Sequence, residues 1–166
     1  MKDVALLVAR LYLGLHFLVL GWAKVSGDPV FDGKPFPESF AEFVQNALDK
    51  GVAFHLWRPV LEGWIKPHAP VFAGIVGWTE LSVGVSLLLG ALVTFSAIGG
   101  IAVMTVNQLC SSPFRASIPL WLRFASVLVY VAVALLLTIL AVHGAGRIYG
   151  LDRFILPERV PEGPLS

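Results

Sequence analysis

Glu80 is the residue of this sequence best suited to do chemistry, because it places a carboxylate in the apolar, glycine-rich stretch GWTELSVG. At mid-membrane depth an ionisable side chain costs at least about 2.5–3.5 kcal/mol, so it normally faces the interior of a helix bundle and has a partner there. Arg10 is the expected partner. At 1.5 Å per residue, Arg10 lies about 9 Å and Glu80 about 16 Å from the same membrane surface, and a long arginine side chain covers much of that difference. Lys24 lies at the far interface and is the poorer partner.

Two roles are open for an Arg10–Glu80 pair, and they do not exclude each other. As a structural element, the pair would fix the register of two helices. As a functional element, it would be a site for a proton or for the headgroup of a quinone. Buried ion pairs often lose more free energy in desolvation than they gain from attraction, so stability alone is a weak reason for this one.

The four histidines do not predict a haem site. His16 lies near the middle of the first apolar segment and His143 at the end of the last, which separates them in depth by about 15 Å at 1.5 Å per residue. The two axial ligands of one haem lie at one level. His55 and His68 lack the spacing of metal ligands, and the single Cys110 provides no cysteine pair. We therefore expect no haem and no metal in this chain, and any redox chemistry needs another bound cofactor or a partner chain.

A largely apolar chain must position these residues. Of its 166 residues, 57% are hydrophobic and 14% are charged, whereas a soluble domain is roughly half apolar and a quarter charged. The net charge of +1, without a basic run, indicates no nucleic-acid partner. The apolar segments are long enough to cross a bilayer. They predict an all-α integral membrane protein, a four-transmembrane-helix bundle in a single domain of residues 1–166. The predicted spans are residues 4–25, 71–91, 93–110 and 118–142, and a short tail, residues 148–166, follows them.

The connection between the first two spans, residues 26–70, is predicted to be helical and amphipathic. Its segment SFAEFVQNALDKGVAF has apolar residues at the spacing of one helix face. Ser39 is expected to cap this helix, and Gly51 to end it. A second, aromatic piece contains Trp57 and Trp64, and tryptophans near the ends of spans favour the headgroup zone. The connection is expected either to lie along a membrane surface or to fold over the bundle as a small helical cap.

Small and polar residues recur at intervals of three and four in three of the spans, which places them on one helix face. Small residues at this spacing let helix backbones approach closely, and polar residues of the same stripe point into the bundle. The stripes consist of Arg10, Gly14, Phe17, Gly21 and Lys24; of Gly77, Glu80, Gly84, Leu87 and Ala91; and of Ser96, Gly100, Val103 and Asn107.

Several ordered motifs resemble those of the DoxX/DoxD family of four-helix membrane proteins. They are Arg-x3-Gly in the first span and its ending GWAK, the block PHAPVFAGIVGWTELSVGVSLLLG, an asparagine late in the third span, and GAGRIYGLD after the fourth. The long connection is similar to that of the DoxD-like branch, the membrane subunit of thiosulfate:quinone oxidoreductase. Matched to the family pattern, the polar positions are Arg10, Lys24, Glu80, Asn107 and Asp152.

The resemblance implies a membrane subunit of a quinone-linked redox complex. Glu80 and Arg10 are then the candidate catalytic pair for a proton and a quinone headgroup, and Lys24, Asn107 and Asp152 are candidate residues for binding the quinone. Partners would be membrane lipid and other membrane or peripheral redox subunits. The alternative is a non-catalytic assembly or scaffolding subunit packed against a larger respiratory or photosynthetic complex.

Four spans place both termini on one side of the membrane. We expect a prokaryotic cytoplasmic membrane with the termini on the cytoplasmic side, although a literal count of basic residues would place the long connection there.

Overall fold

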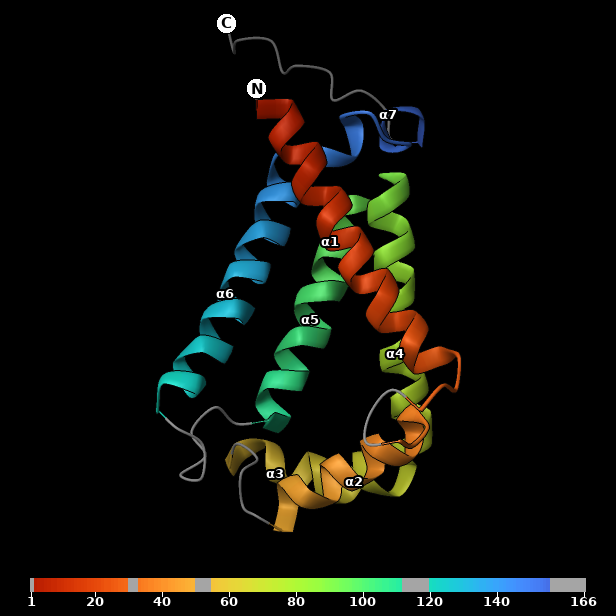
Figure 1. Cartoon of the computed structure of the whole chain (residues 1–166), viewed down its shortest axis with the longest axis vertical. Helices are drawn as coiled ribbons and strands as arrows, with labels where there is room; N and C mark the ends of the chain where they lie inside the picture. Colours follow the sequence, from red (N-terminus) through yellow and green to blue (C-terminus); the bar gives the residue numbers. More distant parts are fainter. Residues whose placement is uncertain (1, 30–32, 50–54, 112–119, 156–166) are drawn as a thin grey trace, which may run out of the picture.

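Four long helices form a bundle in the computed structural model, which describes residues 2–29, 33–49, 55–111 and 120–155. These helices are α1 (Lys2–Val25), α4 (Ala69–Leu89), α5 (Val93–Ser111) and α6 (Leu120–Val142). α1 packs mainly on α4, α4 packs on α5, and α5 packs on α6 (Figure 1). The start of α1 and the end of α6 lie at the same end of the bundle (Figure 1). No strand occurs among the described residues, which confirms the predicted all-helical class.

Each predicted span falls on one of these helices, but only part of the four-span prediction is confirmed. Two helical stretches are long and apolar enough to cross a membrane, Lys2–Val25 and His55–Leu89. The apolar parts of the other two long helices, Val93–Gln108 and Val127–Val142, are shorter. The expected start of the last span at residue 118 and most of the tail lie outside the described residues.

The boundary between α4 and α5 follows from local sequence. Pro70 occupies the first turn of α4, where its missing N–H costs nothing. Gly90 ends the helix in the left-handed conformation, with φ of 65°. The amides of Gly90 and Ala91 donate to the carbonyls of Leu87 and Ser86, which is the pattern of a Schellman motif. The chain therefore turns tightly between α4 and α5.

The glycine stripes form the contact between α1 and α4. A Cβ atom on Gly21 would lie 2.2 Å from the backbone nitrogen of Leu81, and one on Gly84 would lie 2.3 Å from that of Leu18. Real Cβ atoms essentially never come this close to other heavy atoms, so only glycine fits at both positions. The backbones of the two helices touch here, as the spacing predicted.

The connection forms a layer across one end of the bundle (Figure 1). It contains α2 (Phe36–Asp49) and a run of short turns, η1 (His55–Trp57), α3 (Arg58–Val60), η2 (Leu61–Ile65) and η3 (Lys66–His68), which leads into α4. Phe40 and Val44 of α2 are buried with Leu61 and Ile65 of η2. This cluster also includes residues of α4, and hydrophobic residues of α5 pack against it, so α2 covers the bundle as a helical cap.

The predicted start of α2 is wrong. The helix begins at Phe36, so Ser39 lies inside it and is not its cap. Pro37, at the second position, has a fixed φ that suits a first helical turn and allows the earlier start. Gly51, the predicted end, lies outside the described residues.

Candidate functional site

Glu80 forms a buried ion pair with Lys24. The ammonium of Lys24 donates to both carboxylate oxygens at 2.6 Å. The two side chains are 8% and 4% exposed, so the pair is almost fully removed from solvent. The ammonium also lies 5.0 Å from the ring centroid of Phe36, in a cation–π contact with the first residue of α2. The carboxylate therefore has a charged partner, as its position required.

The predicted Arg10–Glu80 pair is wrong, because the register of α1 against α4 places the two residues at different levels. Gly21 lies against the backbone at Glu80 and Leu81, whereas the guanidinium of Arg10 lies against Gly90. Glu80 is ten residues from Gly90 along α4, which is about 15 Å at 1.5 Å per residue. That is about twice the difference in depth expected from the sequence.

Arg10 instead holds the chain that follows α6. One terminal nitrogen, Nη1, donates to the carbonyl oxygens of Ala145 at 2.7 Å and Ile148 at 2.9 Å, and the other, Nη2, donates to that of Tyr149 at 3.4 Å. Arg10 is 1% exposed. Gly150 leaves room for its guanidinium, since a Cβ atom there would lie 2.7 Å from Nη1. Arg10 therefore joins the first helix to the turn after the last.

Asp152 lies at this same end and caps α5. Its carboxylate accepts from the backbone amides of Leu92 at 2.5 Å and Val93 at 3.1 Å. Acceptors of this kind satisfy the unpaired amides of a helix N-terminus and interact favourably with its dipole. In return, the amide of Asp152 donates to the carbonyl of Gly90 at 2.9 Å. The structure therefore separates Arg10 and Asp152 from Glu80 and gives both of them contacts with the backbone.

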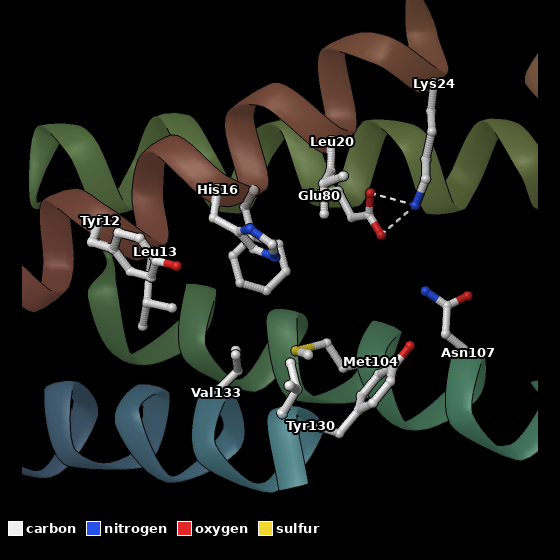
Figure 2. Close-up of a pocket in the computed structure, with 12 residues that line it drawn as sticks. Tyr12, Leu13, His16, Leu20, Lys24, Glu80, Met104, Asn107, Tyr130 and Val133 are labelled. Atoms are coloured by element: carbon white, nitrogen blue, oxygen red, sulfur yellow. Dashed lines mark hydrogen bonds and ion pairs between the residues drawn. The ribbon is translucent and has the colours of Figure 1, made fainter. Parts of the chain in front are cut away.

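A cavity of about 340 Å³ lies beside the Lys24–Glu80 pair. Its lining comes from all four long helices, and Asn107, a predicted binding residue, is part of it. Figure 2 shows Tyr130 reaching in from α6 and Asn107 from α5, on the side opposite the ion pair. The rest of the lining is mostly apolar and includes Leu13, Phe17, Leu20, Met104, Val129 and Val133. Three of the five predicted site residues, Lys24, Glu80 and Asn107, are thus brought together.

Sequence reasoning missed three further polar residues of this cavity, Tyr12, His16 and Tyr130. For His16, the sequence raised only the question of a haem ligand. Tyr130 could have been found, because a phenol within the apolar run LVYVAVALLL is a polar group in a predicted span. Tyr12 and His16 are one turn apart on α1, next to the glycine stripe. The cavity combines an ammonium, a carboxylate, a phenol, an amide and an imidazole within apolar walls, so it suits a largely apolar ligand with a few polar groups.

Long apolar helices, glycine-mediated helix contacts and a buried ion pair define the class of helical membrane proteins. The comparison with protein families identifies the family within this class. The model of the DoxX family matches residues 5–111, which is more than half of the chain, and the protein belongs to this family. The family is membrane-associated. The match covers α1 to α5 and ends before α6.

No curated protein and no solved structure matches the chain.

Proposed function

We propose that this protein is the membrane subunit of a quinone-linked redox complex, of the DoxD-like thiosulfate:quinone oxidoreductase branch, with α1, α4, α5 and α6 all crossing the membrane. The observation that carries the proposal is the cavity beside the Lys24–Glu80 pair. Its apolar walls suit the ring of a quinone, and its polar groups suit the two carbonyl oxygens. The environment is a prokaryotic cytoplasmic membrane, with the termini on the cytoplasmic side.

The ion pair gives this site a means of handling protons. A quinone accepts two electrons and two protons to become a quinol. Were a quinone bound here, the Lys24 ammonium would donate a hydrogen bond to one of its carbonyl oxygens. The Glu80 carboxylate would take up a proton from water and pass it to that oxygen as negative charge develops there, and the second proton would also come from water. The two electrons come from a redox cofactor of a partner subunit that oxidises thiosulfate. Lys24 therefore takes the role that the sequence predicted for Arg10, that of the cationic partner of Glu80.

The test is the replacement Glu80→Gln, with thiosulfate-dependent quinone reduction measured in membranes. We expect turnover to fall at least about 100-fold, which is the lower range for removal of a general acid or base. Glu62→Gln is the matched control, since Glu62 pairs with Arg58 on the surface, away from the cavity. Unchanged turnover of the Glu80→Gln variant, at a normal level of protein, would refute the catalytic role.

A second candidate function is a non-catalytic assembly subunit. It is favoured by a shallow hollow on the outer face of α4 and α5, where Thr79, Ser82, Ser86 and Ser96 lie beside exposed Trp78 and Phe95. Hydroxyl groups and small residues on such a face suit the packing of a further membrane helix. Purification in mild detergent separates the two functions. Stoichiometric quinone in the isolated chain favours the redox subunit, and constant co-purification of another membrane protein without quinone favours the assembly subunit.

A further inference from the structure

His16 is one of the polar residues of the cavity to which the proposed chemistry gives no role. It lies on the same wall as Lys24 but nearer the start of α1, and Figure 2 shows its ring directed into the cavity on the far side of Glu80 from Lys24. Its ring stacks edge-on against Phe17, with 5.7 Å between the centroids. His16 is exposed, so the Phe17 contact covers only one side of the imidazole and offers its nitrogens no hydrogen bond. In hydrocarbon, a polar ring of this kind is costly unless it meets a polar partner.

The spacing along α1 places His16 and the ion pair at different levels of the cavity. Gly21 lies at the level of Glu80, because a Cβ atom on Gly21 would lie 2.8 Å from the carbonyl carbon of Glu80. His16 is five residues before Gly21, or about 7.5 Å at 1.5 Å per residue. A 1,4-quinone that accepts a hydrogen bond at each end needs its two donors roughly 11 Å apart, because roughly 5 Å separate its oxygens and each hydrogen bond adds about 3 Å. Lys24, eight residues beyond His16, lies about 12 Å from it along the helix axis. Leu13 and Phe17, both buried, form the apolar wall at this level.

The mouth of the cavity lies between α1 and α6. Tyr12 of α1 and Val129 of α6 both line the cavity and are 66% and 60% exposed, so the space reaches the outer surface of the bundle between these two helices. If all four helices cross the membrane, this surface faces lipid. A ligand with an apolar tail can therefore enter sideways from the bilayer and leave its tail between α1 and α6.

We infer that His16 is a second recognition residue, which donates a hydrogen bond to the carbonyl oxygen of a para-quinone at the end opposite the oxygen that accepts from Lys24. This inference rests on the proposed function and deepens it. It selects lipid-soluble quinones with oxygens at both ends of the ring over ligands with one. The ring lies between the two ends of the cavity, and the tail leaves through the mouth.

The experiment measures binding by the purified full-length protein in lipid nanodiscs. Two ligands are compared, a decyl-substituted 1,4-benzoquinone and an analogue with the same ring skeleton and tail but a single carbonyl. The variants are His16→Leu, which removes the hydrogen bond, and His16→Gln, whose amide can still donate one. His143→Leu is the matched control, because His143 lies at the end of α6, is exposed and contacts the carbonyl of Ile139 in its own helix.

We expect the wild type to bind the quinone about tenfold more tightly than the analogue, since one hydrogen bond contributes about this factor. His16→Leu should weaken quinone binding by about the same factor and leave the analogue unaffected, while His16→Gln should restore most of the preference. His143→Leu should bind both ligands as the wild type does. The inference is overturned if His16→Leu keeps the preference, or if it weakens both ligands equally, which would indicate packing alone.

Failure of the proposed function gives a different result. In that case, wild-type protein binds neither ligand, and both the quinone site and the role of His16 are refuted. If the wild type binds quinone but shows no preference over the analogue, the cavity is a quinone site and only the second recognition residue is refuted. This preference is measured on the wild type, so the test does not depend on the folding of any variant.

Discussion

The contact between α1 and α4 can be tested by adding one methyl group at Gly84. A Cβ atom there would lie 2.3 Å from the nitrogen and 2.6 Å from the Cα atom of Leu18. Both are backbone atoms, so no side chain can rotate away. An ordinary contact begins at 3.4 Å, and the two helices would have to separate by about 1.1 Å.

The cost follows from this displacement. Overpacking of a core typically costs about 1–3 kcal/mol, and the rigid backbone partner places Gly84→Ala at the upper end of this range. Alanine is better than glycine in a helix by about 1 kcal/mol, which leaves a net destabilisation of about 2 kcal/mol. For a chain of this size, 1 kcal/mol corresponds to about 2–4 °C in Tm, so we expect a decrease of about 4–8 °C.

Gly74→Ala is the matched control on the same helix. A Cβ atom on Gly74 meets nothing within 4 Å. This variant should keep the wild-type Tm or exceed it by a few degrees, because it gains helix propensity without a clash. The assay is thermal unfolding of the purified proteins in one detergent. A Gly84→Ala protein as stable as Gly74→Ala would show that α1 and α4 do not touch as described.

Two further predictions concern the buried charges. Lys24→Met should destabilise the protein by about 3–5 kcal/mol, because it leaves the Glu80 carboxylate buried without its partner, and adding Glu80→Gln to it should recover most of that loss. Thermal unfolding of the four proteins of this double-mutant cycle checks the coupling, and additive effects would contradict it. Asp152→Ala should cost about 2 kcal/mol, since the amides of Leu92 and Val93 lose their acceptor, and Asp152→Asn about half of that. Equal unfolding temperatures for the wild type and Asp152→Ala would show that the cap contributes nothing.

The inward faces of the helices could be predicted from the sequence. Arg10, Gly14, Phe17 and Gly21 are buried on α1, and the stripe around Glu80 is buried on α4. The periodicity of an α-helix alone decides which residues share a face, so this part needs no knowledge of the neighbours. The helical cap was one of two alternatives, and the buried cluster of α2 with η2 and α4 supports it.

The partner of Glu80 could not be predicted, because counting residues from a membrane surface does not fix the register between two helices. That register depends on the close contacts of Gly21 and Gly84, which appear only once the backbones are placed. The partners of Arg10 could not be predicted from the sequence for a second reason. They are backbone carbonyls, and every residue has one, so no pattern of side chains indicates which will be used.

The contacts of Arg10 have a consequence for the order of biosynthesis. Arg10 leaves the ribosome long before its acceptors at Ala145 and Ile148, which follow 135 and 138 residues later. Until they are made, the first helix contains a guanidinium that is costly in hydrocarbon. The nascent chain therefore needs a hydrated or protein-lined environment for Arg10 until Ala145 and Ile148 have been made. A ribosome that stalls before Ala145 would leave this charge exposed as a mark of an unfinished chain.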